Sequence, residues 1–334
     1  MPVNVGVIGA GMIGAEHARR LATEICGSQL AAIYDVAADR ARQLADELGC
    51  GVRDSAEALI ADPAVDAVIL ASPSPLHAVQ TLCCVAAGKP VLCEKPLATS
   101  AEDAARIIEA EAAGSRRLVQ VGFMRRYDPA LRGVRAAVAD GVIGEPLLAH
   151  AVHRNPAAAP GFRSEMVPTD VLIHEFDQFR WIFGQEVIAT TAVRVRSTPG
   201  AGPELRDPQV LLLELADGAL VELEAYVTCQ YGYDVRCEVV GSRGVVQLEN
   251  PAVTPLSVDG ARRVPVPADW RARFAEAYRI ELQEWVNGLA GDRVAGPNAW
   301  DGYAAAAVAD SAVASLHSGV RTPVELIAKP AFYD

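Results

Sequence analysis

The sequence predicts an α/β protein with two domains, the first a doubly wound parallel sheet and the second an α+β domain with a mostly antiparallel sheet. Over residues 1–122, short and fully apolar strands alternate with helices of about 10 to 15 residues, which is typical of a parallel sheet covered on both faces. Over residues 123–334, longer strands alternate apolar with polar residues and are joined by tight turns, which favours antiparallel pairing. We therefore expect a domain boundary between residues 122 and 123.

In the first domain each predicted strand is short enough for a buried sheet, and two of the predicted helices end before a glycine. Gly49 and Gly88 stand where a helix commonly ends in a left-handed residue. Right-handed crossovers between such strands produce a doubly wound fold. The predicted strands are 3–8, 29–34, 65–71, 90–93 and 118–121, and the predicted helices are 12–23, 39–48, 76–87 and 101–113.

In the second domain, hairpin turns separate the predicted strands. Asp217-Gly218 is a strong hairpin signal, and residues 241–244 form another tight turn. Apolar residues alternate with glutamates in the strand 220–228, so we expect one face of the sheet to be buried. Two amphipathic helices end the chain, and whether they pack back on the first domain is left open. The predicted strands are 209–215, 220–228, 235–240 and 245–248, and the predicted helices are 128–140, 170–183, 272–289 and 300–316.

Composition argues against several classes of function. The chain has 334 residues and a net charge of −12, with no basic run that could neutralise a series of phosphates, so we expect no nucleic-acid partner. No stretch approaches the roughly 18 apolar residues that cross a bilayer, and no signal peptide is recognised. The seven cysteines lack Cys-x-x-Cys spacing, which argues against disulfides and a zinc site. We expect a cytoplasmic protein that binds neither a metal nor a membrane.

A Gly-x-Gly-x-x-Gly run at residues 9–14 follows the first predicted strand and opens the first helix. Alone, such a run usually marks only a glycine turn, but this context predicts a dinucleotide site. The first glycine permits a tight turn, the second lets the backbone approach the pyrophosphate, and the third allows close helix–strand packing. The helix N-terminus offers N–H groups to the phosphates. The predicted cofactor contacts are Gly9, Gly11, Met12, Ile13 and Gly14.

Asp35 is an independent test of this interpretation. It follows the second strand about 20 residues beyond the glycines, where a carboxylate can bind the ribose hydroxyls. A 2′-phosphate would meet a like charge there, so we expect NAD as the cofactor rather than NADP. Arg40, one turn later, leaves room for NADP as a poorer cofactor.

Two further segments stand at the carboxyl ends of predicted parallel strands, where ligands bind in open α/β sheets. Ser72 and Pro73 follow the third strand, and we expect them to lie over the cofactor, although prolines there could simply end the strand. Glu94 and Lys95 follow the fourth strand, where a lysine would point at the nicotinamide. Taken alone, this lysine could equally be a surface residue.

The segment Asp170-Val-Leu-Ile-His174 combines a carboxylate with an imidazole. Spaced by four on a predicted helix, the two side chains share one face. A carboxylate beside an imidazole fixes its tautomer and stabilises its protonated form, as a general base near neutral pH requires. A lone histidine on a helix is more often structural, whereas this pair has the chemistry of proton transfer.

Other polar residues are not assigned to catalysis. His150 and His153 are three apart in a strand and lie on opposite faces, so we reject a metal pair. His17 and His77 have no partner visible in the sequence. Arg126 is expected only to brace a local turn.

These motifs together resemble the Gfo/Idh/MocA oxidoreductase family, in which a Rossmann domain precedes an α/β domain with a large open sheet. The similarity covers nearly the full chain, and it is closest to the inositol 2-dehydrogenase branch. The segments that resemble this branch are 122–128, 153–156, 206–209, 231–234, 300–303 and 330–334.

The resemblance implies NAD-dependent oxidation of the 2-hydroxyl of myo-inositol to 2-keto-myo-inositol (scyllo-inosose). In the implied catalytic trio, His174 takes the hydroxyl proton, Lys95 hydrogen-bonds the same oxygen, and Asp170 orients the pair. The resemblance also implies a cis bond between Lys95 and Pro96, and a homotetramer. The residues implied to bind the cyclic polyol are Lys95, Met124, Arg125, His153, Asn155, Asp170, His174, Asp177 and Tyr233.

Two alternatives stay open. The substrate could be scyllo-inositol, chiro-inositol, another cyclitol or a hexose such as glucose, because the loop 166–169 lies where substrate-facing segments vary within the family. A non-catalytic NAD(H)-sensing protein on the same fold is less favoured, since a sensor need not keep an acid–base pair.

Overall fold

The computed structural model describes residues 2–248, 255–291 and 293–334. The chain divides into two compact units. The first contains Met1–Met124, Glu276–Ala306 and Leu326–Asp334, and the second contains Arg125–Ala275 and Ala307–Glu325. The domain boundary that we place between residues 122 and 123 stays a prediction. Within the described ranges, no helix is both long and apolar enough to span a membrane.

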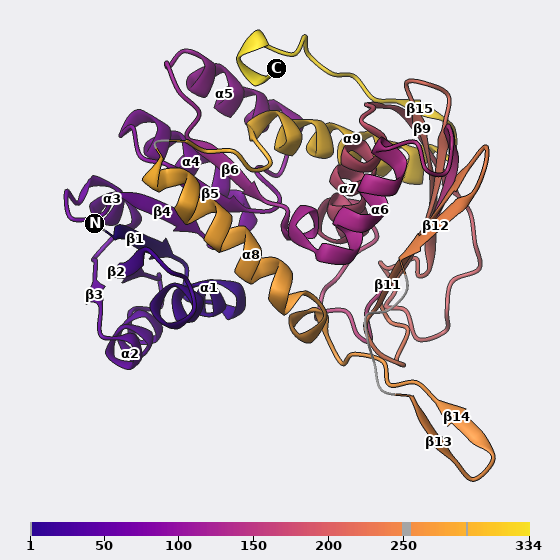
Figure 1. Cartoon of the computed structure of the whole chain (residues 1–334), viewed down its shortest axis with the longest axis horizontal. Coiled ribbons are helices and arrows are strands. Elements are labelled where there is room, and N and C mark those ends of the chain that lie inside the picture. Colours follow the sequence, from indigo (N-terminus) through magenta and orange to yellow (C-terminus); the bar gives the residue numbers. More distant parts are fainter. Residues whose placement is uncertain (1, 249–254, 292) are drawn as a thin grey trace. The chain divides into compact units, whose positions relative to one another are not determined.

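The first unit is built on a six-stranded parallel sheet in the order β3-β2-β1-β4-β5-β6 (Figure 1). The strand order reverses between β1 and β4, so the carboxyl ends of these strands flank the crevice where ligands bind in such sheets. The strands are β1 (Val3–Ile8), β2 (Ser28–Tyr34), β3 (Gly51–Val52), β4 (Ala67–Leu70), β5 (Val91–Glu94) and β6 (Val119–Gly122).

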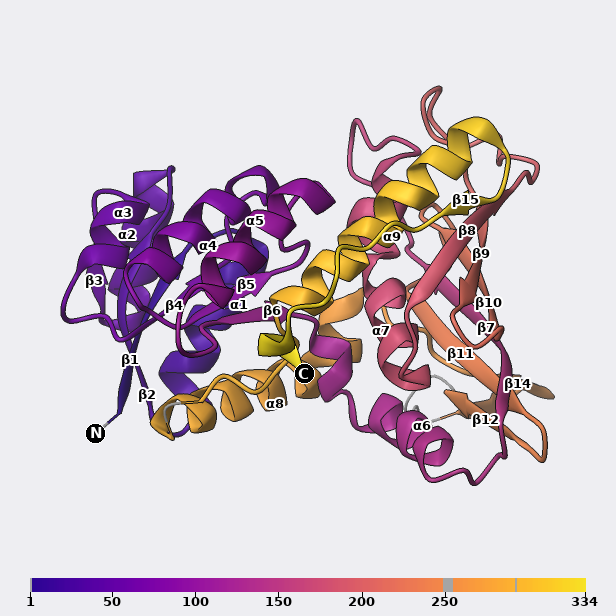
Figure 2. The ribbon, with the colours of Figure 1, turned by 90° about the horizontal axis from the view of Figure 1, so that it is seen from above.

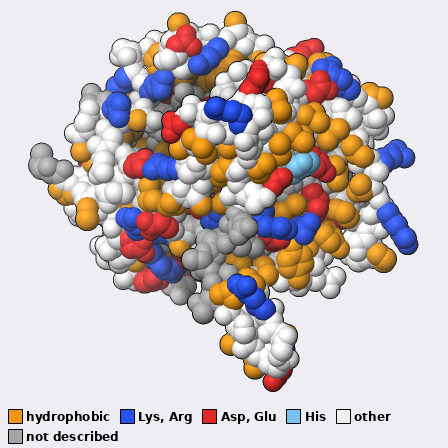
Figure 3. Space-filling model, turned by 45° about the vertical axis from the view of Figure 1, so that its right-hand side comes forward, with side chains coloured by type: hydrophobic (Ala, Val, Ile, Leu, Met, Phe, Trp, Pro, Cys, Tyr) orange, Lys and Arg blue, Asp and Glu red, His pale blue; other side chains and the backbone are white. Residues whose placement is uncertain are grey.

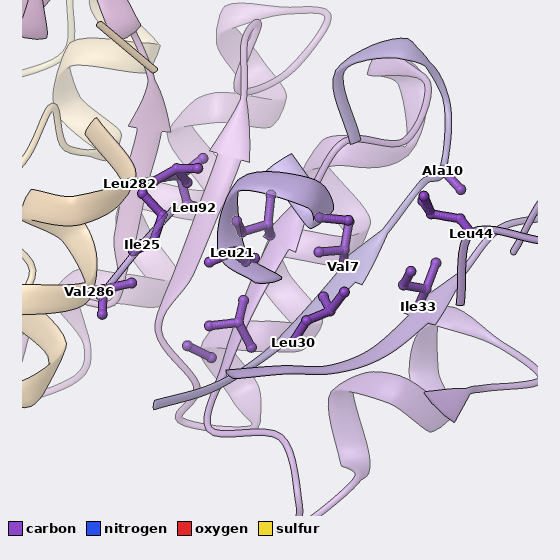
Figure 4. Packing of buried hydrophobic residues seen from close by; sticks show 14 of the residues in the cluster. Val7, Ala10, Leu21, Ile25, Leu30, Ile33, Leu44, Leu92, Leu282 and Val286 are labelled. Atoms are coloured by element: carbon purple, nitrogen blue, oxygen red, sulfur yellow. The ribbon is translucent and has the colours of Figure 1, made fainter. Parts of the chain in front are cut away.

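Helices cover both faces of this sheet (Figure 2). On one face, α1, α2 and α8 share a single apolar core with the strands. Figure 4 shows Leu282 and Val286 of α8 beside Ile25 and Leu92, and burial of each such side chain contributes roughly 1.5–3 kcal/mol. The helices are α1 (Met12–Thr23), α2 (Ala38–Leu48), α3 (Ala56–Ala61), α4 (His77–Ala86), α5 (Ala101–Ala112) and α8 (Trp270–Ala290), the last of which begins in the second unit.

The second unit contains a seven-stranded sheet in the order β12-β11-β7-β10-β9-β8-β15. Among its described strands β7 and β10 are parallel neighbours, and the other pairs are antiparallel. Every second residue of β9 and of β10 is buried, and in β10 the buried residues are the apolar ones that alternate with glutamates, as predicted. The strands are β7 (Pro146–Arg154), β8 (Val187–Val193), β9 (Gln209–Leu215), β10 (Leu220–Tyr226), β11 (Asp234–Gly241), β12 (Val245–Leu248) and β15 (Thr322–Pro323).

One face of this sheet is covered by helices. In Figures 1 and 2 these are α6 (Pro129–Ala139), α7 (Ile173–Phe183) and the second half of α9 (Ala299–Ser318). The Ser315 hydroxyl accepts a hydrogen bond from the Ala192 N–H of β8 at 2.8 Å, which ties α9 to the sheet. Figure 3 shows hydrophobic side chains gathered among charged ones on the side of the molecule that carries this sheet. A separate hairpin consists of β13 (Leu256–Val258) and β14 (Ala261–Arg263).

The predicted helix over residues 170–183 is wrong at its start. Val167–Val171 form a π-helical turn, and α7 begins only at Ile173, so Asp170 precedes this α-helix. The Leu172 N–H donates to the Val167 carbonyl at 2.8 Å, which is the wide spacing of a π turn. Pro168, inside the turn, has no N–H to continue a tighter ladder.

The predicted amphipathic character of the last long helix is also wrong for its first half. Residues 299–309 of α9 are buried on nearly all sides. Their many alanines allow neighbours to approach from every direction, whereas a period of apolar residues predicts only one buried face. The short elements β3, β15 and α3 were not predicted, because two to six residues are too few to establish a period.

Candidate active site

The glycine run forms the turn between β1 and α1, and each glycine has a different steric setting. Gly9 has φ of +99°, and a Cβ there would lie 2.4 Å from the Ala71 carbonyl oxygen. A Cβ at Gly14 would lie 1.9 Å from the Gly9 carbonyl oxygen. A Cβ at Gly11 would meet nothing within 4 Å. Two glycines are therefore required by the fold itself, and the third leaves open space at the N-terminus of α1, which no side chain caps.

Asp35 directly follows β2 and faces the same turn. Its Oδ2 accepts a hydrogen bond from the Ala10 N–H at 2.7 Å, and its Oδ1 accepts one from the Ala37 N–H at 2.8 Å. The residue is 8% exposed. The Arg40 guanidinium lies 3.6 Å from Oδ2. The carboxylate is thus held beside the glycine turn, where it can accept hydrogen bonds from a diol.

The loops after β4 and β5 are joined by His77. Its Nδ1 lies 2.7 Å from the Pro96 carbonyl oxygen, and its Nε2 lies 2.8 Å from the Ser72 carbonyl oxygen. Burial lowers the pKa of His77, but Cys93 and the two carbonyls outweigh it and raise the pKa to about 9. Two carbonyl acceptors require two N–H donors, so the geometry also favours the imidazolium. The sequence showed no partner for this histidine, yet it fixes both predicted cofactor loops.

Glu94 and Lys95 lie at the carboxyl end of β5. The Lys95-Pro96 bond is cis, as the resemblance implied. Glu94 is 5% exposed, and its Oε1 lies 2.7 Å from Nε2 of His17 on α1. The Lys95 N–H donates to Glu94 Oε2 at 3.3 Å. His17, for which the sequence showed no partner, is therefore part of this site.

Asp170 and His174 lie in the second unit. Asp170, in the π turn, is half-buried and accepts a hydrogen bond from the Thr169 hydroxyl at 3.1 Å. His174 lies in the first turn of α7 and is 8% exposed. Lys95, the third residue of the predicted trio, belongs to the first unit.

Beside this helix, a buried charged cluster joins two of the residues proposed to bind substrate. Arg125, 1% exposed, forms an ion pair with Glu175 and donates to Gln178 Oε1 at 3.1 Å. Glu175 Oε2 lies 3.1 Å from His153 Nδ1. Burial raises the pKa of Glu175, but the charges of Arg125 and His153 outweigh it and lower the pKa to about 2. Sequence analysis missed Glu175 and Gln178, which carry no motif of their own.

Tyr233 and Asn155 are two further residues that were predicted to bind the polyol. The Tyr233 ring packs edge-on against His153, with 5.7 Å between ring centroids. Burial raises the pKa of Tyr233 to about 12, so its hydroxyl stays protonated. Asn155 follows β7, where its N–H donates to the Tyr226 carbonyl at 3.0 Å. His150 and His153 lie on opposite faces of β7, as expected, and exposed His150 pairs with Glu222 at 2.6 Å.

Asp177 is more constrained than the sequence suggested. It is 1% exposed and receives two hydrogen bonds from the Arg126 guanidinium, at 2.9 Å and 2.5 Å. The expectation that Arg126 only braces a local turn is therefore wrong, because its partner lies 51 positions away on α7. Met124, 2% exposed, ends the first of the three chain segments that make up the first unit.

Comparison with known families identifies both parts of the chain. Residues 3–123 match the oxidoreductase family with an NAD-binding Rossmann fold that is termed Gfo/Idh/MocA. Residues 135–326 match the C-terminal α/β domain of that family.

Full-length relatives and solved structures agree with this result. Inositol 2-dehydrogenase 3 of Saccharopolyspora erythraea is 46% identical over 100% of this chain and 98% of the relative. Inositol 2-dehydrogenase of Pseudomonas syringae pv. syringae is 43% identical over 100% of both chains. The crystal structure of myo-inositol dehydrogenase from Lactobacillus casei in complex with NAD(H) and myo-inositol has a TM-score of 0.97, 35% identity and 100% coverage of both chains. Scyllo-inositol dehydrogenase from the same organism, with NAD(H) and scyllo-inositol, has a TM-score of 0.89, 25% identity and coverage of 97% and 99%.

Proposed function

Because the chain belongs to the Gfo/Idh/MocA oxidoreductase family, we propose that it oxidises the 2-hydroxyl of myo-inositol to 2-keto-myo-inositol with NAD. The observation that carries this proposal is the full-length similarity to a myo-inositol dehydrogenase whose structure contains NAD(H) and myo-inositol. Relatives at 46% and 43% identity that are named inositol 2-dehydrogenase support it.

The residues of the first unit fit NAD. The open space at Gly11 can receive the pyrophosphate, and the uncapped N-terminus of α1 can donate to it. Asp35 can accept hydrogen bonds from the ribose hydroxyls. We assign the loop that contains Ser72 and Pro73 and the segment Glu94-Lys95 to the nicotinamide side of this site. When bound, the nicotinamide ring supplies the acceptor for the hydride.

We assign proton transfer to His174, Asp170 and Lys95. His174 would remove the proton of the reacting hydroxyl, and Asp170 would orient the imidazole and stabilise its protonated form. Lys95 would donate a hydrogen bond to the oxygen that becomes the ketone. Asp170 lies in the π turn that directly precedes α7, the helix that carries His174.

The proposed polyol contacts act as a preorganised set. Arg125 and His153 are tied together by Glu175, and Asp177 is held by Arg126, so these side chains lose little freedom when a substrate binds. A site with several fixed donors and acceptors rejects polyols whose hydroxyls point elsewhere. Met124, Asn155 and Tyr233 belong to the same proposed set.

We also propose a cytoplasmic homotetramer. All seven cysteines are free in the structure, in agreement with a reducing compartment. Hydrophobic side chains gather among charged ones on the side that carries the seven-stranded sheet, as expected for a subunit contact (Figure 3). The mass in solution, measured by light scattering against 35.3 kDa per chain, tests the oligomeric state.

The deciding experiment measures NADH or NADPH formation by the purified protein with NAD or NADP and a panel of myo-inositol, scyllo-inositol, chiro-inositol and glucose. Preferred turnover of myo-inositol with NAD is the expected result. Preferred turnover of scyllo-inositol would support the second candidate, to which the similarity with scyllo-inositol dehydrogenase points. NADH binding without any turnover would favour a substrate outside this panel or a sensor.

A further inference from the structure

Glu281 on α8 is a buried carboxyl group that the proposed reaction does not use. Its exposed fraction is 0%, and neither of its oxygens has a hydrogen-bond partner among the described residues. A carboxylate in such a position is strongly disfavoured relative to the neutral acid, because nothing replaces its lost hydration. In agreement, burial and the nearby Glu94 raise the pKa of Glu281 well above its usual value.

The negative charge of Glu94 contributes to the raised pKa of Glu281. Glu94 itself lies close to His17, to the Lys95 N–H and to Gly122. Its Oε1 lies 2.7 Å from His17 Nε2, and its Oε2 accepts a hydrogen bond from the Lys95 N–H at 3.3 Å. A Cβ at Gly122 of β6 would lie 3.1 Å from the carboxyl carbon of Glu94. The position of the Glu94 carboxylate is therefore coupled directly to the backbone of Lys95.

Two further side chains, Tyr278 and Arg20, pack beside this cluster. Tyr278 lies one helical turn before Glu281 and packs edge-on against His17, with 5.7 Å between ring centroids. The Arg20 guanidinium of α1 lies 5.6 Å from the Tyr278 ring centroid and pairs with Glu16 at 3.3 Å. The packing of Leu282 and its neighbours in the core of the first unit holds α8 in place (Figure 4). Among the described residues, the cluster thus includes the carboxyl groups of Glu94 and Glu281 and the imidazole of His17.

We propose that Glu281 is a positioning residue for Lys95, and that it works as an uncharged carboxylic acid. While Glu281 is neutral, Glu94 pairs with His17 and accepts the hydrogen bond of the Lys95 N–H. Ionisation of Glu281 at alkaline pH places two carboxylates in one buried cluster, and their repulsion displaces Glu94 together with the start of the Lys95 segment. Turnover is then lost at alkaline pH for a reason separate from proton transfer to His174. The inference rests on the proposed function only for the role of Lys95.

The test compares the wild-type protein with Glu281→Gln and with Glu284→Gln, a matched control that removes an exposed carboxylate from the same helix. Infrared spectra of the three proteins are recorded at neutral pH. The difference between wild type and Glu281→Gln is expected to show the band of a protonated carboxylic acid, and the difference between wild type and Glu284→Gln is expected to lack it. In assays of NADH formation, the alkaline midpoint of kcat is expected to rise by about one pH unit or more in Glu281→Gln. It should stay at the wild-type value in Glu284→Gln.

Either of two results overturns the proposal. One is a neutral-pH spectrum without a carboxylic-acid band that depends on Glu281, and the other is a pair of kcat profiles for wild type and Glu281→Gln that superimpose. The spectra are recorded without substrate, so they test the proton state even if the chain fails to oxidise myo-inositol. If Glu281→Gln does not fold, Glu111→Gln takes its place, because Glu111 is another buried carboxyl group with a raised pKa. A carboxylic-acid band that persists in Glu111→Gln and disappears as the pH is raised supports the proposal, and its absence overturns the proposal.

Discussion

Arg125 and Glu175 form an ion pair in which each side chain is only 2% exposed. Glu175 lies next to His174 in α7, and it also contacts His153 on β7. One carboxylate thus joins the helix of the proposed general base to a strand that carries a proposed polyol contact. Removal of either partner leaves a charge in the protein interior, which is far more costly than the loss of a surface pair.

Glu175→Gln is therefore expected to lower the free energy of unfolding by about 3–5 kcal/mol, because the Arg125 guanidinium would remain buried without its anion. Glu222→Gln is the control, since Glu222 pairs with His150 at the surface, and the expected loss there is only about 0–1 kcal/mol. Urea unfolding measures both. Equal losses in the two variants would contradict the importance of the buried pair.

His77 predicts a pH dependence of stability. Its pKa in the folded protein is about 9, above the value of about 6.5 in an unfolded chain. Its contribution is thus fully present below the unfolded pKa and is lost as the pH rises through about 9. The melting temperature of the wild type should fall over this interval more than that of His77→Gln. The exposed His150→Gln serves as control, and parallel curves for the wild type and His77→Gln would refute the prediction.

Gly11 and Gly14 should respond differently to the same added methyl group. Gly11→Ala is expected to fold with near-normal stability and to bind NADH at least about tenfold more weakly, because its Cβ occupies the space assigned to the pyrophosphate. Gly14→Ala is expected to lose at least about 1–3 kcal/mol of stability, because its Cβ collides with the backbone of Gly9. Thermal melts and NADH fluorescence titrations separate the two effects. Unchanged NADH affinity in Gly11→Ala would show that the pyrophosphate does not bind at this turn.

Asp35→Ser should shift the cofactor preference toward NADP. Loss of the carboxylate removes its repulsion of a 2′-phosphate, and Arg40, now without this partner, becomes available to bind it. The ratio of kcat/KM for NADP to that for NAD is expected to rise by about tenfold or more. Asp39→Ser is the control, since that side chain is 98% exposed. An unchanged ratio in Asp35→Ser would show that cofactor choice is made elsewhere.

Lys95→Ala should separate chemistry from cofactor binding. Turnover is expected to fall by about 10²–10⁴-fold, because the reacting oxygen loses its hydrogen-bond donor, while NADH affinity stays close to the wild-type value. Lys329→Ala, which removes a lysine paired with Asp334, controls for the loss of charge. Steady-state kinetics and fluorescence titration provide the two readouts, and near-normal turnover in Lys95→Ala would refute the proposed trio.

Local motifs were predictable because their residues are adjacent in the chain. The glycine run and Asp35 each follow an apolar strand, and in the structure the Asp35 carboxylate accepts a hydrogen bond from Ala10 within the glycine turn. The partners of the site were not predictable, because they are distant in the sequence. His17 and Glu94 are 77 positions apart, and Arg125 and Glu175 are 50 apart. The sequence around each of these residues would look the same if the residue had no such partner.

The sequence by itself determined the fold class, the parallel pairing of strands in the first sheet and the location of the dinucleotide turn. This was possible because periodicity and glycine spacing are local properties that act through burial and backbone sterics. Only the tertiary structure decided that Asp170 lies in a π turn, that His77 joins two loops, and that Glu281 is fully buried. These features depend on which distant side chains are brought together away from water, where the cost of an unpaired charge decides the arrangement.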